Sequence, residues 1–223
     1  MKTYDQFIRE GVYDPNIFKA VFMAGGPGSG KSFVAGKTTG GLGLKMINSD
    51  TPFERFLKKE GLSLKMPEAE TEKRDVERAR AKKVTASKKF HAVKGRLGIL
   101  IDGTGHVYDK VVKQAGMLQQ IGYETSMVFV NTSLEVALAR NEQRARSVMP
   151  KLVKKSWQDV QNNMGKFQNF FGPKSFFIVD NNGVEQDMLE ISTKLIRRAI
   201  SKPVNNKIAT AWIANEMKKK DRS

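Results

Sequence analysis

Residues 19–32 read KAVFMAGGPGSGKS, and this stretch decides the fold of the chain. An apolar run at residues 20–24 leads into glycines, a lysine and a serine that match the pattern GxxxxGK[ST]. The pattern has the context it needs, because a predicted strand precedes it and a predicted helix follows it. Glycines let successive backbone N–H groups turn inward without a Cβ in the way, which forms a concave anion site. The stretch therefore predicts a binding site for a nucleoside triphosphate.

The residues of this loop divide into those that shape the site and those that carry chemistry. Lys31 can reach the β- and γ-phosphates, and the hydroxyl of Ser32 can coordinate Mg²⁺. The helix that begins at the loop adds its free N–H groups and its dipole. ATP and Mg²⁺ are thus the predicted cofactors. The expected cofactor-binding residues in the loop are Gly25, Gly26, Pro27, Gly28, Ser29, Gly30, Lys31 and Ser32.

Length and composition fit one intracellular domain. At 223 residues with 39% hydrophobic content, the chain suits a single α/β domain over residues 1–223 that carries an insertion. It has no cysteine, which excludes disulfides and thiolate metal sites. The N-terminus lacks the apolar core of a signal peptide, and no apolar run approaches the ~18 residues of a membrane span. We expect a soluble, cytoplasmic protein.

The charge balance is strongly basic. Lys and Arg total 39 against 23 Asp and Glu, which gives a net charge of +16. Such a surplus favours a polyanionic partner, nucleic acid first and an anionic membrane or acidic protein second. The plain alternative is a surplus that serves solubility or reflects a basic proteome.

Strands and helices alternate along the chain, which predicts a parallel sheet with right-handed crossovers. The expected fold class is an α/β, five-stranded parallel sheet flanked by helices. The predicted strands are residues 20–24, 44–47, 97–101, 126–130 and 176–179. The predicted helices are residues 33–37, ended by the glycines that follow, then 51–57, 68–94, 107–121, 134–146, 151–171, 184–200 and a last one that opens at Pro203.

Residues 53–96 are a predicted helical insertion. Its long helix carries a modest apolar stripe at near-helical spacing, formed by Val76, Ala79, Ala86, Phe90 and Val93. No acid occurs between Lys82 and Arg96, so Lys82, Lys83, Lys88 and Lys89 form a basic run. This run can track a nucleic-acid backbone, although a solvated helical face is its ordinary explanation.

Acidic residues follow two further predicted strands. In an open parallel sheet the site lies at the carboxyl ends of the strands. Asp50 is the candidate base for an attacking hydroxyl, although it could merely cap a helix. Asp102 is the candidate acid on the Mg²⁺ side, and Thr104 after it could contact substrate. His106 lies nearby and could also touch substrate, although a structural role is the more common one.

The segment of residues 140–155 is a candidate lid. Arg140 and Arg144 are four residues apart and share a helix face, and Pro150 follows. Both arginines could close over the triphosphate and stabilise charge on the transferring group, because a guanidinium offers a planar set of donors. An ordinary solvated basic face is the alternative.

These motifs together resemble a known group of proteins. GGPGSGKS, NSD at Asp50, ILIDGTG at Asp102 and the lid RNEQRARSVMP resemble the P-loop kinases that include phage-type polynucleotide kinases and zeta-toxin-like kinases. The lid is similar to the polynucleotide kinase pattern, and the acid-Gly-Thr after the third strand to the zeta-toxin branch. The resemblance implies that Asp50 activates the hydroxyl and that Arg144 is the lid arginine that contacts ATP.

Two classes of function follow from these motifs. The leading hypothesis is an ATP-dependent kinase of a hydroxyl on nucleic acid or a nucleotide, either an end hydroxyl or a hydroxymethylated base as in phage DNA modification. The second enzyme hypothesis is a zeta-toxin-like kinase of a nucleotide-activated sugar. The other class is a non-catalytic ATP-binding switch, against which the presence of Asp50 beside a complete phosphate loop argues.

Overall fold

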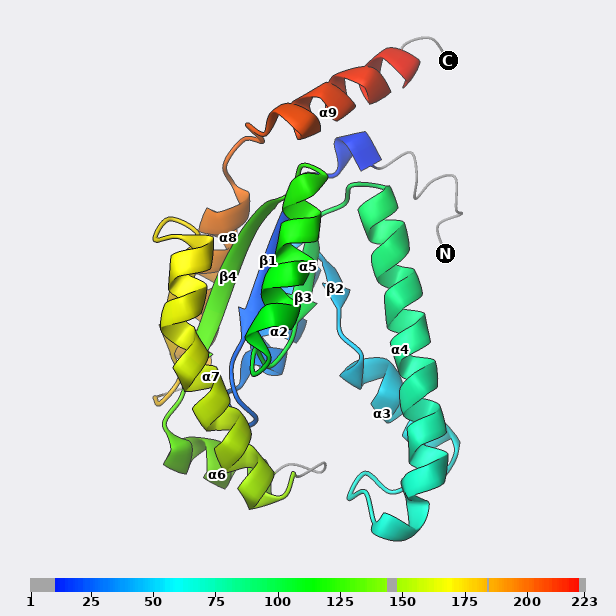
Figure 1. Cartoon of the computed structure of the whole chain (residues 1–223), viewed down its shortest axis with the longest axis vertical. Coiled ribbons are helices and arrows are strands. Elements are labelled where there is room, and N and C mark those ends of the chain that lie inside the picture. Colours follow the sequence, from blue (N-terminus) through cyan, green and yellow to red (C-terminus); the bar gives the residue numbers. More distant parts are fainter. Residues whose placement is uncertain (1–10, 144–147, 184, 221–223) are drawn as a thin grey trace.

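The sheet has the predicted number and direction of strands. The computed structural model describes residues 11–143, 148–183 and 185–220. All strand pairs are parallel, in the order β2-β3-β1-β4-β5 (Figure 1). The fold is therefore the expected α/β fold with a five-stranded parallel sheet. Its strands are β1 (Lys19–Ala24), β2 (Lys45–Ile47), β3 (Ile99–Asp102), β4 (Glu124–Asn131) and β5 (Phe176–Asp180).

The strand order places the phosphate loop at the centre of the sheet. β1 lies between β3 and β4, while the chain from β1 crosses to the far edge at β2. Met23 of β1 is paired in register with Asp102 of β3, so the loop after β1 begins beside the end of β3. Ligands of open parallel sheets bind at such a switch in strand order. The topology therefore gathers the loops after β1, β3 and β4.

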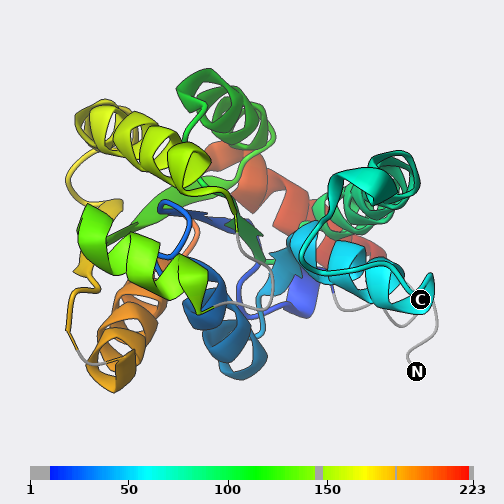
Figure 2. The same ribbon diagram turned by 90° about the horizontal axis from the view of Figure 1, so that it is seen from below.

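Helices cover both faces of the sheet. Side chains alternate along a strand, and in β1 Phe22 faces the layer of α5 and α7 while Val21 and Met23 face α2 and α8. Figure 2 shows these two layers on opposite sides of the sheet. Both faces are apolar, as a parallel sheet between two helical layers requires. The helices are α2 (Lys31–Leu42), α5 (Tyr108–Gln120), α7 (Pro150–Phe171) and α8 (Glu185–Ile200).

The predicted insertion forms a helical unit beside the sheet. It consists of α3 (Asp50–Lys59), a short 3₁₀ helix η2 (Glu68–Glu70) and α4 (Thr71–Lys94). Phe53, Phe56 and Leu57 of α3 pack with Ala81 of α4 in a small core of their own. In Figure 1 the lower half of α4 extends away from the sheet together with α3. The unit therefore borders the carboxyl ends of β2 and β3 without covering them.

The apolar stripe that the sequence suggests for α4 is not its buried face. Val76 is 65% exposed and Phe90 62%, whereas the buried apolar residues of the helix are Ala81 and Ala92. Small side chains let α4 approach α3 and the sheet closely, and the larger apolar residues remain outside. The spacing of large side chains therefore predicted the helix, whereas its packing depends mainly on Ala81 and Ala92, with Val93 of the stripe packed against the main core.

Other helix boundaries differ from the expectation in small ways. α2 does not stop at its first glycines but continues to Leu42, and it ends at Gly43, whose φ of 73° is left-handed. Glycine inside a helix costs about 1 kcal/mol relative to alanine. Burial of Val34 and Ala35 against the sheet offsets that cost. The remaining helices are α6 (Leu134–Glu142), which ends before residue 146, and α9 (Lys207–Lys220), which begins four residues after Pro203.

Candidate active site

The phosphate loop joins β1 to α2 in the conformation that its glycines predict. Gly28 and Gly30 have φ angles of 80° and 82°, a region that glycine occupies freely. Space is limiting as well, because a Cβ on Gly28 would collide with the backbone of Ala137 and one on Gly30 with the side chain of Asn181. The loop is thus packed closely against α6 and the residue after β5, and α2 begins directly after it at Lys31.

Three neighbouring strand ends hold the loop in place. The carbonyl oxygen of Ser29 accepts a hydrogen bond from Asn181 Nδ2 at 2.6 Å, just after β5, and from Thr132 Oγ1 at 3.5 Å, just after β4. The N–H of Gly25 donates to the carbonyl of Thr104, after β3, at 3.0 Å. Asn181 is 1% exposed, so its bond to Ser29 is shielded from water. The loop is therefore positioned by contacts that are distant in sequence.

Replacing Asn181 with alanine tests this support. The buried carbonyl of Ser29 would keep only its long bond to Thr132, and loss of a buried partner costs about 1–3 kcal/mol. We expect a lower midpoint of thermal unfolding and weaker binding of ATP, measured by calorimetry. Asn182→Ala is the control, because that side chain contacts Ser133 and Asp180 instead. Native unfolding and ATP affinity in Asn181→Ala would show that the loop does not need this bond.

A cavity of about 490 Å³ lies over the phosphate loop. Lys31, Ser32 and Arg140 line it, as does Gly183 after β5. The guanidinium of Arg140 donates to the carbonyl of Asn181 at 2.9 Å, which fixes α6 against the loop after β5. The loop residues in the wall are Gly26, Gly28, Ser29, Gly30, Lys31 and Ser32.

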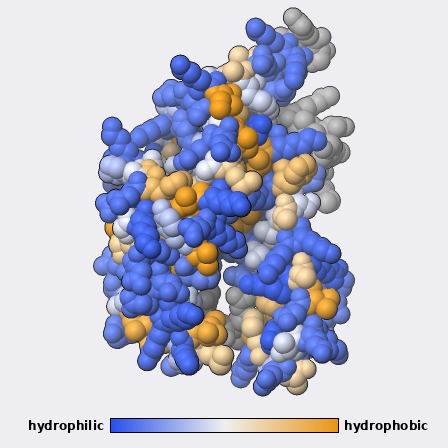
Figure 3. Space-filling model, viewed as in Figure 1, coloured by the Kyte–Doolittle hydropathy of each residue, from blue (hydrophilic) through white to orange (hydrophobic). Residues whose placement is uncertain are grey.

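The remaining predicted residues of this part of the site are placed differently. Gly25 lies where the loop leaves β1, bonded to Thr104, and neither it nor Pro27 is among the described lining residues. Arg144, the predicted lid arginine, lies outside the described residues. Of the described residues of the candidate lid, Arg140 and Gln143 line the cavity. Figure 3 shows a hollow in the molecule between the α6–α7 side and the α3–α4 side.

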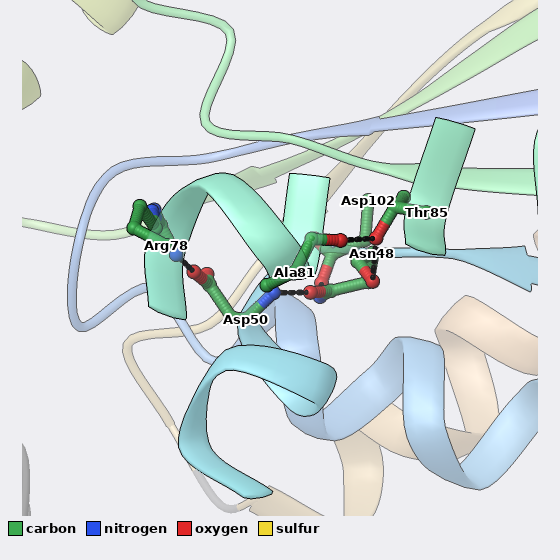
Figure 4. Close-up of polar contacts among 6 residues, drawn as sticks. All are labelled: Asn48, Asp50, Arg78, Ala81, Thr85 and Asp102. Carbon is green, nitrogen blue, oxygen red and sulfur yellow. Dashed lines mark hydrogen bonds and ion pairs between the residues drawn. The ribbon is translucent and has the colours of Figure 1, made fainter. Parts of the chain in front are cut away.

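The ends of β2 and β3 are joined to α4 by a polar network (Figure 4). Asn48 donates through Nδ2 to Asp102 Oδ2, and its Oδ1 accepts from the N–H of Asp50. Thr85 of α4 donates to the carbonyl of Asn48 at 3.3 Å and to that of Ala81 at 2.8 Å. Asn48 therefore links the two acids that the sequence singled out, through the carboxylate of Asp102 and the backbone N–H of Asp50.

Asp50 is held by an ion pair with α4. The Arg78 guanidinium lies 2.8 Å from Asp50 Oδ1 and stacks 4.6 Å from the centre of the Phe53 ring (Figure 4). Both partners are partly exposed, at 36% and 41% of their side chains. Asp50 is the first residue of α3, whose N-cap position is held by Ser49, so Asp50 is not the cap but an acid in the first turn, where it complements the helix dipole. Its neighbour Ser49, rather than Asp50, lines the adjacent cavity.

A second cavity of about 440 Å³ lies between β3, α4 and α5. Asp102, Thr104 and His106 form its wall after β3, and Lys82 and Lys89 approach from α4. Burial lowers the pKa of Lys89 below the ordinary lysine value. Volumes of 300–1,000 Å³ are usual for sites that bind small molecules. The two cavities are therefore a phosphate-loop site and a neighbouring site of suitable size for a second substrate.

The comparison with known proteins identifies the family. The family model for zeta toxin matches residues 13–187, which include both cavities' strand ends and all of α4. This chain belongs to the zeta toxin family. Zeta toxins of this fold are P-loop kinases, so the chain is an ATP-dependent phosphotransferase with an alcohol group as acceptor. The resemblance to zeta-toxin-like kinases is confirmed, and the non-catalytic switch is set aside. No curated protein matches the chain in sequence.

Solved structures share the fold of this zeta toxin family member at low identity. A kinase structure from Chloroflexus aurantiacus is 16% identical, with a TM-score of 0.53, and the match covers 82% of this chain and 96% of that one. The PezAT toxin–antitoxin structure from Streptococcus pneumoniae is 14% identical, with a TM-score of 0.50 and coverage of 89% and 96%. The AvrRxo1-ORF1:-ORF2 structure with ATP is 13% identical, with a TM-score of 0.56 and coverage of 80% and 62%.

The two predicted Mg²⁺ ligands of this zeta toxin family member lie on different walls. Ser32 lines the phosphate cavity and Asp102 the second one. Asp102 Oδ1 is buried and accepts no hydrogen bond from any described residue. In the described part of the chain, His, Asp and Glu side chains nowhere gather in threes as a metal site would need. Hard oxygen donors suit Mg²⁺, which usually takes one or two carboxylates plus phosphates and water.

The sequence analysis did not identify the roles of Asn48 and Asn181. It also did not separate the α4 lysines that line the second cavity from those that do not. The run DNN after the fifth predicted strand was an available signal for Asn181, because the ends of parallel strands meet at one edge of the sheet. The positions 82, 85, 86 and 89 were a signal for the lysines, because they share one helix face.

No helix in the described residues has the length and apolarity to cross a membrane.

Proposed function

We propose that this kinase transfers the γ-phosphate of ATP to a hydroxyl of a nucleotide-activated sugar bound in the second cavity. The observation that carries the proposal is that cavity: about 440 Å³, beside the phosphate loop, with lysines in its wall. A nucleotide sugar combines a diphosphate, which matches the lysines, with less polar parts, which match Ile101, Val107 and Val111 in the same wall. Zeta toxins act on uridine-diphosphate sugars, which supports this acceptor class.

Each site residue has a proposed role in the transfer. Lys31 would bind the β- and γ-phosphates, and Arg140, with Arg144 of the lid, would stabilise charge on the transferring group. Asp50 would accept the proton of the acceptor hydroxyl, with Arg78 holding its carboxylate and Asn48 fixing its backbone N–H. In a loose transition state the proton leaves late, so orientation of the carboxylate matters more than strong basicity.

Mg²⁺ is the proposed second cofactor. Ser32 and Asp102 would hold the ion directly or through water. Among the described residues, Oδ1 of Asp102 has no hydrogen-bond partner. When bound, the ion would neutralise charge on the phosphates of ATP. The protein's own part is the placement of these two oxygens in the first turn of α2 and at the end of β3.

The nucleic-acid acceptor that the charge of the chain favoured is not supported by the comparisons. The comparisons support neither DNA binding nor a phage origin. The basic run on α4 does not act as one surface, because Lys82 and Lys89 line a cavity whereas Lys83 and Lys88 do not. The net charge of +16 remains the specific observation in favour of a polymer.

Transfer of labelled γ-phosphate from Mg·ATP to a panel of acceptors tests the proposal. The panel contains uridine-diphosphate sugars, free sugars, nucleoside monophosphates, oligonucleotides with free end hydroxyls and duplex DNA with hydroxymethylated bases. We expect the nucleotide sugars to be the efficient acceptors, with free sugars far weaker because they lack the diphosphate. Phosphate release without acceptor is the control for plain ATP hydrolysis. Preferred transfer to an oligonucleotide would overturn the proposal in favour of the polymer.

A further inference from the structure

The second cavity is bordered by one face of α4. Lys82, Thr85, Ala86 and Lys89 line it, at spacings of three, one and three residues that place them on a single side of a helix. Lys110 and Gln114 of α5 line the same cavity. In Figure 1 α4 and α5 stand on either side of the ends of β2 and β3. Lysines from two separate helices thus line the same cavity.

The charges in this wall are unbalanced. Among the described lining residues there are three lysines, Lys82, Lys89 and Lys110, and one carboxylate, that of Asp102. Asp102 already accepts a hydrogen bond from Asn48 through Oδ2. No described carboxylate lies within ion-pair distance of the three lysines. A cavity that holds cations without counter-charges is suited to bind an anion.

Lys89 shows the cost of this arrangement. Its side chain is half-buried, and this burial lowers the pKa of its ammonium group. A buried charge is unfavourable unless it is paired. An anionic ligand in the cavity would provide the missing partner. The fold therefore maintains an uncompensated lysine at a position where a ligand can neutralise it.

We propose that Lys82, Lys89 and Lys110 form a diphosphate subsite that makes α4 the specificity-determining helix of the acceptor cavity. This inference rests on the proposed function, because it assigns the anionic part of that acceptor to these side chains. Lysine binds phosphate as a flexible point charge with three donors, so three lysines from two helices can surround a diphosphate without a fixed fork geometry. Selection follows, because an acceptor without the diphosphate leaves the lysines unpaired.

The same geometry disfavours a polymer on this helix. A nucleic-acid backbone lying along α4 would contact its exposed lysines, of which Lys83 and Lys88 lie outside the described cavity wall. The diphosphate subsite instead uses Lys82 and Lys89, which share one face of α4 and line the same cavity. These two pairs have the same residue type and lie on one helix, and only Lys82 and Lys89 line the cavity. They therefore make matched test and control positions.

The test measures binding without catalysis. A uridine-diphosphate sugar and, separately, inorganic pyrophosphate are titrated into the protein by calorimetry in the absence of ATP. We expect Lys89→Gln to weaken binding of both probes about tenfold, as for loss of one charge-assisted contact, and Lys82→Gln/Lys89→Gln about a hundredfold. Lys83→Gln and Lys88→Gln should change either affinity less than twofold. Lys89→Arg, which keeps the charge, should recover most of the loss, and all variants should bind ATP normally.

The outcomes separate the inference from the proposed function. If pyrophosphate binds with the expected lysine dependence but no uridine-diphosphate sugar binds, the subsite stands and the proposed acceptor is wrong. If the nucleotide sugar binds but Lys89→Gln and Lys82→Gln do not weaken it, the subsite is wrong and the proposed acceptor stands. Equal losses in Lys83→Gln and Lys88→Gln would replace the subsite with general charge attraction. A wild-type protein that binds neither probe would overturn both.

Discussion

Replacing Lys31 with alanine is expected to slow phosphate transfer about 100- to 1,000-fold while the protein remains folded. Lys31 lines the phosphate cavity and is partly exposed, so its ammonium group can act on the phosphates and packs no part of the core. Loss of one preorganised donor to developing charge has an effect of this size. Steady-state transfer of labelled phosphate measures the loss, and thermal unfolding measures the fold.

Lys83→Ala is the matched control for this experiment. It removes the same charge from an exposed site that lines neither cavity in the described structure, so transfer should stay within twofold of the wild-type rate. A comparable loss in both variants would show that net charge, rather than the phosphate loop, determines the rate. A native rate in Lys31→Ala would place the phosphate site elsewhere in the fold.

Replacing Asp50 with asparagine should lower the transfer rate about 100- to 10,000-fold, the usual contribution of a general base. Asparagine keeps the shape of the side chain and removes the proton acceptor. ATP affinity should change little, because Asp50 lies outside the described wall of the phosphate cavity. Single-turnover transfer with saturating ATP measures the chemical step, and calorimetry measures ATP binding.

Arg78→Gln separates the chemical role of Asp50 from its ion pair. An exposed ion pair contributes about 0–1 kcal/mol, so Arg78→Gln should reduce the rate far less than Asp50→Asn does. If the two variants lose activity and thermal stability equally, Asp50 acts by anchoring α3 to α4, and the base must be sought elsewhere. Full turnover in Asp50→Asn would leave Asp50 as an acid in the first turn of α3 with a structural role only.

Some of this architecture could be predicted because it depends on local chemistry. The phosphate loop needs residues that occupy left-handed φ angles, and Gly28 and Gly30 supply them wherever the chain places the motif. The five strands are short apolar runs, and a parallel sheet between two helical layers requires apolar side chains on both faces. Strand ends converge in such a sheet, so Asp102 could be placed beside the loop before any coordinates.

Helix limits and packing faces were harder because they depend on the surroundings. α2 runs past Gly40 and Gly41 since its contacts with the sheet outweigh a penalty of about 1 kcal/mol per glycine. α4 buries Ala81 and Ala92 and leaves Phe90 exposed, because close approach to α3 and the sheet requires small side chains there. A ranking by hydrophobicity alone would bury Phe90 before Ala81 and Ala92.

By itself, the sequence determined that the chain has a site for a nucleoside triphosphate, since the glycines, Lys31 and Ser32 of the phosphate loop are contiguous and follow a strand. Tertiary structure decided how the rest of the site is held and what the second cavity offers. Asn181 supports Ser29 from 152 positions away, and Arg78 reaches Asp50 from 28. Lys82 and Lys89 line the second cavity, whereas Lys83 and Lys88 of the same helix do not. A linear pattern cannot contain such information, because hydrogen bonds and cavities depend on distances in space that folding alone establishes.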